Sequence, residues 1–344
     1  MHYSWEYTVK AILFFLISLL LTLLITPMVI RLAIKYNCID NPGKRSFHKN
    51  PTPRWGGLAF FIGVLPIFLF IEMNRQIASY LIASFLLITM GGIDDWKPLG
   101  WKIKLLGSIL ATTIVIFGGE VIIYHIGSYS FFGKVSLEML STPFTYLSVI
   151  GVTNAINLID GLNGLASGVS LIAFLFIGIA AHLSGNHVLG LMAIAFIGAL
   201  AGFLRYNFPK ARIFMGDSGS LFLGFSLAVF SILLTQDERF HIEPMFPVMV
   251  LLIPIFDTLR IMLVRAFKLR NPFKADKIHL HHLLVRRGFS SVSTVIFFWS
   301  LTFIYGLIAI SMIKMTSTPY LVVVLLNFFI LSLFAHSLGR RRRK

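Results

Sequence analysis

Two adjacent carboxylates, Asp94 and Asp95, end an apolar run that extends from Ile77 to Ile93. Neighbouring residues on a helix project about 100° apart, so these two side chains cannot share one face. One of them can therefore approach a ligand while the other meets a metal ion, a base or a cation. The alternative is a pair of solvated charges that stop a helix, and the pair alone does not decide between the two.

A second polar group lies in the stretch from Asn154 to Leu165. Asn157 and Asp160 are three residues apart, so they lie on one face if this segment is helical. Gly161 and Gly164 permit a tight turn, or the close approach of a ligand to the backbone. A polar stripe at the end of an apolar run indicates a binding surface rather than an ordinary loop.

Glycines flank Asp217, and serines follow it, in the segment FMGDSGS at residues 214–220. This pattern is typical of a helix N-terminus that holds phosphate or a metal-bound anion. An ordinary N-cap explains Asp217 equally well.

Three histidines, His279, His281 and His282, occur within four residues. They can bind zinc, donate protons to phosphate, or form a solvated polar surface. The chain has no HExxH pattern, and its single cysteine, Cys38, excludes an internal disulfide and a cysteine-rich metal site. Contact with phosphate or pyrophosphate is therefore favoured over zinc.

The elements that must position these residues are membrane spans. The chain is 57% hydrophobic and 13% charged, with a mean hydropathy of +0.84, which excludes an ordinary soluble protein. A bilayer core of ~30 Å takes about 20 apolar residues per helix, and the runs lack the alternation of barrel strands. We expect an all-α integral membrane protein with about eleven transmembrane helices, or ten if one short run does not cross. The candidate spans lie near residues 9–30, 56–71, 77–93, 103–118, 141–157, 164–183, 188–204, 219–235, 244–264, 292–312 and 319–337.

The net charge of +16 suggests a nucleic-acid partner, but the distribution of charge argues against one. If the first span ends in the cytoplasm, 25 of the 30 Lys and Arg residues fall in or beside cytoplasmic segments. The positive-inside rule then places the N-terminus outside and the C-terminus in the cytoplasm. The basic tail becomes an anchor on anionic membrane lipids, and no nucleic acid is expected as a partner.

We expect one polytopic membrane domain over residues 1–344, without internal repeats. Its cytoplasmic active-site loops would be 31–55, 94–102, 205–218 and 265–291. The external segment 119–140 is rich in β-branched and aromatic residues, which predicts a small hairpin around Gly127 and Ser128.

The four polar groups converge on one chemistry. Asp and Asn side chains, imidazoles and glycine-rich turns on one face fit a site for a nucleotide diphosphate with Mg²⁺, or Mn²⁺ in its place. Magnesium prefers oxygen ligands and shares them with substrate phosphates. Phosphoryl transfer needs positioning and charge neutralisation more than covalent chemistry by the protein. The membrane setting suggests that one reactant is a lipid.

The segments MGGIDDW, NAINLIDGLNGLA, FMGDSGSLFLG and HLHHLL resemble the motifs of the polyprenyl-phosphate N-acetylhexosamine-1-phosphate transferases, in family order over about residues 40 to 290. This superfamily includes the MraY translocases and the WecA/TagO enzymes. The resemblance implies transfer of a sugar 1-phosphate from a UDP-sugar to undecaprenyl phosphate, with release of UMP. It also implies a multi-pass protein of the bacterial cytoplasmic (inner) membrane with a cytoplasmic active site.

The same resemblance implies residue roles. Asp94 and Asp95 match the paired catalytic aspartates, one of which deprotonates or orients the lipid phosphate, and Asp217 matches the Mg²⁺-binding aspartate. His281 and His282 match a catalytic histidine motif. The residues that the resemblance assigns to substrate binding are Lys49, Asn157, Asp160, Asn163, Asn207, Phe214 (against uracil) and His279.

Two departures from the MraY pattern bear on the donor. MraY enzymes carry three consecutive histidines, whereas Leu280 interrupts them here, and Asn163 stands where they have an Asp that contacts the nucleoside. Both favour UDP-GlcNAc, giving undecaprenyl-PP-GlcNAc and the first step of a cell-envelope glycan such as teichoic acid or O-antigen. The alternatives are UDP-FucNAc, UDP-QuiNAc or UDP-MurNAc-pentapeptide as donor. A homodimer is the alternative to a monomer. Outside the enzyme class, the alternative is a cation-coupled transporter, since intramembrane acids often mark ion paths.

Overall fold

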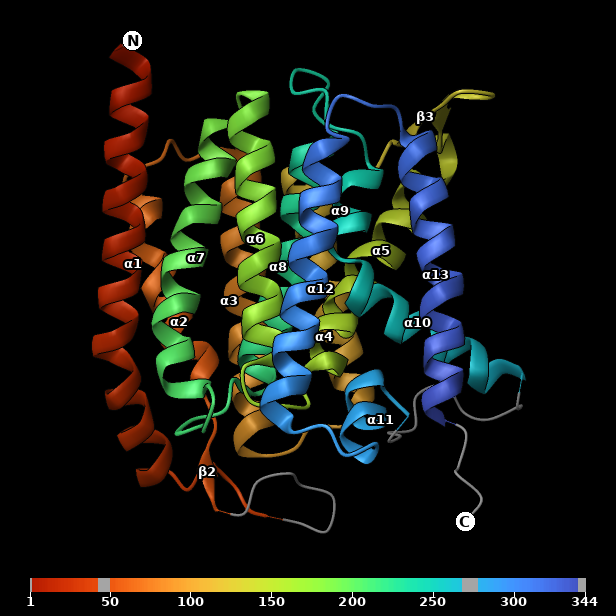
Figure 1. Ribbon diagram of the computed structural model, residues 1–344. Helices are drawn as coiled ribbons and strands as arrows, with labels where there is room; N and C mark the ends of the chain where they lie inside the picture. Colours follow the sequence, from red (N-terminus) through yellow and green to blue (C-terminus); the bar gives the residue numbers. More distant parts are fainter. Residues whose placement is uncertain (1, 43–49, 268–277, 340–344) are drawn as a thin grey trace.

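The computed structural model describes residues 2–42, 50–267 and 278–339, and within these ranges it is a bundle of long helices with two small two-stranded sheets (Figure 1). Lys49 lies outside the described residues, so its predicted role stays a prediction. The first half of the chain contains α1 (His2–Lys35), β1 (Ile39–Asp40), β2 (Thr52–Pro53), α2 (Gly56–Val64), α3 (Arg75–Trp96), α4 (Trp101–Thr113), β3 (His125–Tyr129), β4 (Gly133–Ser136) and α5 (Ser141–Ile159). The second half contains α6 (Leu165–Ser184), α7 (His187–Asn207), α8 (Gly216–Thr235), α9 (Met245–Val250), α10 (Leu252–Phe267), α11 (Leu280–Arg286), α12 (Ser291–Ser311) and α13 (Ser317–Gly339).

Eight helices of the described chain are long and apolar enough to cross a membrane. They are α1, α3, α4 with the π-helical turn Ile114–Gly118, α6, α7, α8, α12 and α13. The other three predicted runs are helical as well. The first forms α2 and the 3-10 helix Leu65–Leu69, the second forms α5, and the third forms α9 and α10. The predicted run 244–264 is helical but divides into two helices at Leu251.

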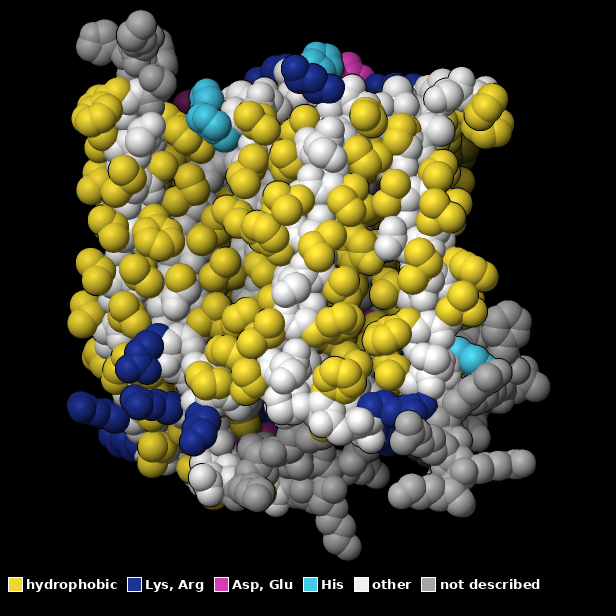
Figure 2. Space-filling model, in the orientation of Figure 1, with side chains coloured by type: hydrophobic (Ala, Val, Ile, Leu, Met, Phe, Trp, Pro, Cys, Tyr) yellow, Lys and Arg dark blue, Asp and Glu magenta, His cyan; other side chains and the backbone are white. Residues whose placement is uncertain are grey.

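Helix α8 is the core of the bundle. In its apolar 18-residue stretch, 89% of the residues are buried, whereas only 17% are buried in the corresponding stretch of the peripheral α13. Helices α2, α3, α5 and α6 surround α8, so its N-terminus meets the ends of several other elements. Figure 2 shows apolar side chains over the middle of the molecule, with Lys and Arg gathered toward its two ends. Such a belt suits a lipid environment.

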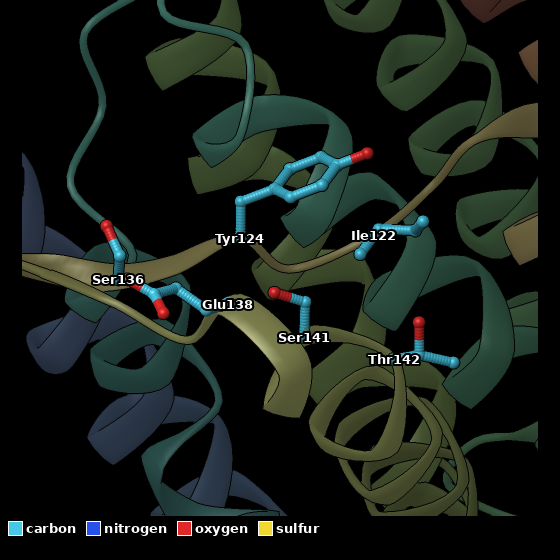
Figure 3. Close-up of a pocket in the computed structure, with 6 residues that line it drawn as sticks. All are labelled: Ile122, Tyr124, Ser136, Glu138, Ser141 and Thr142. Carbon is cyan, nitrogen blue, oxygen red and sulfur yellow. The ribbon is translucent and has the colours of Figure 1, made fainter.

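The predicted hairpin in 119–140 is confirmed, but its turn lies at residues 130–132 and not at Gly127–Ser128. Strands β3 and β4 are antiparallel, and Tyr129 pairs with Gly133. The hairpin lies at the opposite end of the bundle from α11 (Figure 1). Beside it is an open cavity of about 360 Å³, lined by Ile122, Tyr124, Ser136, Glu138, Ser141 and Thr142 (Figure 3). This lining contains none of the predicted site residues.

Candidate active site

The start of α8 is docked on the end of α3 through Asp95. The Asp95 carboxylate accepts hydrogen bonds from the backbone N–H groups of Asp217 (2.8 Å) and Ser218 (3.1 Å) and from the Ser218 hydroxyl (2.8 Å). A carboxylate at these free N–H groups stabilises the helix terminus. Gly216 has a φ of 74°, and a Cβ there would lie 2.2 Å from Asp95 Oδ2, so the motif needs glycine at this position.

Asp94 turns away from its neighbour, toward Lys104 on α4. It accepts a hydrogen bond from the Leu99 backbone N–H at 2.7 Å, and its other oxygen lies 3.3 Å from the Lys104 ammonium. The same ammonium lies 2.7 Å from Asp217 Oδ2. One cation thus bridges two carboxylates that are far apart in the sequence. Asp94 and Asp95 diverge as helix geometry requires, and the structure brings Asp94 and Asp217 together.

The second motif lies along the same end of α8. Asn157, near the end of α5, donates to the Ser220 hydroxyl at 2.8 Å. Asp160 follows α5 directly, and burial together with the charges of Asp217 and Asp95 raises its pKa to about 7. Asn163 instead donates to the Pro209 carbonyl at 3.2 Å. Asn157 thus contacts the first turn of α8, and Asp160 is close enough to Asp217 to be affected by its charge.

Asn207 and Phe214 hold the loop that leads into α8. The buried Asn207 amide accepts from Gly164 N (2.8 Å) and Ser167 Oγ (3.1 Å) and donates to the Ile213 carbonyl (3.0 Å). The Phe214 backbone pairs with residues 53 and 56 at 2.8 Å and 3.0 Å. Asn207 is therefore a brace between α6, α7 and this loop. Contacts of Asn207 and Phe214 with a nucleotide stay predictions.

The histidine motif meets the second motif at Gly161. A Cβ on Gly161 would lie 2.3 Å from His281 Nε2, so glycine is needed for this contact. His281 is 1% exposed, and neither of its ring nitrogens has a hydrogen-bond partner among the described residues. Burial, aided by the nearby His282, lowers its pKa to about 3, so the ring is neutral at pH 7. The ring centroids of His281 and His282 are 4.3 Å apart.

Two charged residues of this region were not predicted as site residues. Lys104 bridges Asp94 and Asp217, and Asp257 on α10 lies 2.8 Å from His279 Nδ1. Asp257 is the single acid in the apolar run 244–264, and that isolation was a signal that could have found it. Lys104 offered only a weaker signal, as a basic residue near the start of a helix.

The described residues contain no group of three or more His, Cys, Asp or Glu side chains that could hold a metal ion by themselves. Magnesium, however, is commonly bound through one or two carboxylates together with substrate phosphates. Asp94 and Asp217 already share one cation, the Lys104 ammonium, and therefore present two oxygens toward a common point. The residues present fit a divalent cation held jointly with a phosphorylated substrate.

Comparison with known proteins links these motifs to one family. Residues 77–235 match the model of glycosyl transferase family 4. The chain is 36% identical over 339 residues to the probable undecaprenyl-phosphate N-acetylglucosaminyl 1-phosphate transferase of Bacillus subtilis (strain 168), covering 97% of this chain and 94% of the relative.

Two further relatives carry names that refer to different sugar substrates. The undecaprenyl-phosphate alpha-N-acetylglucosaminyl 1-phosphate transferase of Escherichia coli (strain K12) is 30% identical over 76% of this chain and 72% of its own length. The phospho-N-acetylmuramoyl-pentapeptide-transferase of Caldicellulosiruptor bescii is 32% identical over 89% of this chain and 98% of its own length. Identity alone does not separate the two donors. Every relative named here is a transferase, which decides against the transporter.

Proposed function

The chain belongs to glycosyl transferase family 4, in its WecA/TagO-like branch, and we propose that it transfers N-acetylglucosamine 1-phosphate from UDP-GlcNAc to undecaprenyl phosphate. It is a sugar-phosphate transferase, as its relatives are. The products of the proposed reaction are undecaprenyl-PP-GlcNAc and UMP, and the reaction would begin the synthesis of a cell-envelope glycan.

The observation that carries the proposal is the convergence of Asp94, Asp217 and Lys104 at the end of the bundle where all four motifs lie. A phosphate dianion attacking a pyrophosphate brings negative charges together, so the site must neutralise them. A divalent cation held by Asp217 and Asp94, when bound, would neutralise the donor pyrophosphate and the departing UMP. The Lys104 ammonium, which contacts both carboxylates, supplies a second positive charge beside that position.

The remaining residues position the reactants. Asp95 fixes the N-terminus of α8, and therefore fixes where the Asp217 side chain points. Asn207 holds the loop before α8, and Phe214 on that loop would pack against the uracil base. The neutral His281 ring is buried against Gly161, and His282, which lies beside it, would contact phosphate. These roles support a site that holds a nucleotide sugar between the α8 terminus and α11.

The proposed location is the bacterial inner membrane, with the site facing the cytoplasm. Eight apolar helices and bacterial relatives support a multi-pass membrane protein. The uneven distribution of Lys and Arg supports the orientation with the α11 end inside. At that end, UDP-sugars from the cytoplasm and the headgroup of the lipid phosphate can both reach the site. The hairpin β3–β4 would then face outward.

A donor comparison tests the proposed function. Purified protein is given undecaprenyl phosphate and Mg²⁺ with UDP-GlcNAc, UDP-FucNAc, UDP-QuiNAc or UDP-MurNAc-pentapeptide in turn, and released UMP is measured. We expect UDP-GlcNAc to give the highest kcat/KM, because a site that pairs the polar groups of one donor can reject others by factors up to ~10⁴. The name of the Caldicellulosiruptor bescii relative refers to a pentapeptide substrate. An equal or higher kcat/KM with UDP-MurNAc-pentapeptide would therefore refute the choice of sugar.

A further inference from the structure

Helix α10 contacts the start of α11 through one buried acid, Asp257. Its side chain is 3% exposed and makes three contacts. Oδ2 lies 2.8 Å from His279 Nδ1, while Oδ1 accepts from the Leu280 backbone N–H at 3.0 Å and from the Arg260 guanidinium at 3.1 Å. Arg260 also donates to the Ile278 carbonyl. The carboxylate that contacts the His279 ring is therefore itself fixed by the Arg260 guanidinium and the Leu280 N–H.

This network determines which nitrogen of His279 carries the proton. A carboxylate paired with a guanidinium is an acceptor only, and it already accepts from the Leu280 N–H. The hydrogen between Asp257 and His279 must then belong to Nδ1. In the neutral ring, Nε2 carries the lone pair, so Nε2 is the atom that can gain a proton.

Asp94 and Asp95 have hydrogen-bond or ion-pair partners on both of their carboxylate oxygens. Both oxygens of Asp95 accept hydrogen bonds from the start of α8. Asp94 accepts from the Leu99 N–H and pairs with Lys104. The only described hydrogen bond of the His279 side chain is the one at Nδ1.

The position of His279 links it to the rest of the site. Its ring stacks on that of His281, with centroids 5.6 Å apart and planes 17° apart, and His281 lies against Gly161 beside Asp160. The charged and titratable groups that face His279 are Asp257 and Arg260 from α10 and His281 and His282 from α11.

We propose that Asp257 is a positioning residue that fixes His279 in the Nδ1–H tautomer, so that Nε2 accepts the proton of a phosphate monoester monoanion. This role rests on the proposed function, in which that monoester is the lipid phosphate. In the step, the phosphate O–H bond breaks and an Nε2–H bond forms, which leaves a phosphate dianion ready to attack. The imidazolium that results is balanced by the Asp257 carboxylate. No other bond changes, and no further reactant is required.

The test is the tautomer itself, read without substrate. Full-length protein with ¹⁵N-labelled histidines is studied in detergent by NMR, and a His279→Gln variant assigns the signals of His279. We expect a protonated Nδ1 and an unprotonated Nε2 in the wild type. In Asp257→Asn the amide oxygen keeps the Leu280 and Arg260 bonds while its NH₂ donates to Nδ1, so the tautomer should reverse. A wild-type ring protonated at Nε2 alone overturns the proposal, even if the variant does not fold.

Turnover supplies the second measurement. Asp257→Asn should lower kcat by about 10²–10⁴-fold, the range for losing a positioned general base or its correct tautomer, with little change in the KM for the donor. Asp237→Asn is the matched control, because Asp237 also pairs with an arginine, Arg239, but belongs to the 236–244 connection outside the site. We expect that variant to match the wild type. Reversal of the tautomer without loss of kcat refutes the role of Asp257, whereas failure of the wild type to release UMP from any donor refutes the proposed function instead.

Discussion

Replacing Asp95 with asparagine separates a structural role of this carboxylate from a chemical one. Asp95 has three hydrogen bonds to the start of α8, at 2.8, 3.1 and 2.8 Å. An amide keeps only one oxygen, so at least one bond is lost and the new NH₂ group faces a donor. A hydrogen bond to a charged group contributes roughly 1.5–3 kcal/mol, and a negative charge at a partly buried helix N-terminus adds up to about 2 kcal/mol.

Part of this loss is offset, because the substitution removes a buried charge and its repulsion by Asp217. The free energy of unfolding should therefore fall by about 2–4 kcal/mol, which at about 1.36 kcal/mol per tenfold change is roughly 30- to 1,000-fold in the unfolding equilibrium. The assay is reversible unfolding in mixed micelles, followed by circular dichroism. Asp217→Asn is the control, because the Asp217 side chain contacts Lys104 and makes none of the hydrogen bonds by which Asp95 holds the start of α8. If Asp95→Asn unfolds like the wild type but loses turnover, the structural reasoning is wrong.

Three further predictions concern the metal, the histidines and the topology. Asp217→Asn, or a chelator added to the wild type, should abolish most UMP release without unfolding the protein, and full activity in either case would refute a metal at Asp217. The unfolded chain binds a proton at the ordinary histidine pKa of 6.5 but folded His281 binds one only near 3, so stability should fall as the pH drops from 7 toward 3. His281→Gln should lose part of that acid sensitivity, and an unchanged pH dependence would contradict the buried neutral ring. A thiol reagent that cannot cross membranes should label Phe131→Cys in intact cells, but Lys102→Cys only after the inner face is opened, and the reverse pattern would overturn the orientation. Native Cys38 is buried and adds little background.

The apolar runs predicted the helices because length and hydropathy are local properties of the chain. Each of the eleven runs became helical, and the β-branched segment 119–140 became a hairpin. Two local details became visible only in the structure, namely the break at Leu251 and the position of the hairpin turn. Both depend on backbone geometry that hydropathy does not encode.

The four motifs were likewise visible in the sequence, because their polar residues interrupt or end long apolar runs. What the sequence could not reveal was the partner of each one. Asp95 meets Ser218 across 123 residues, and Lys104 meets Asp217 across 113. Such pairings are decided by which helices pack together and by the glycines that let them approach.

By itself, the sequence therefore determined a helical membrane protein and the residue types of its site. Only the tertiary structure decided that Asp95 caps α8, that Lys104 joins Asp94 to Asp217, and that Asp257 contacts His279. The physical reason is that apolar burial depends on each segment of the chain, whereas a hydrogen bond depends on two segments that meet. Burial of apolar surface acts on each segment separately, whereas a hydrogen bond needs its two atoms about 3 Å apart, a condition that only the packed bundle can meet.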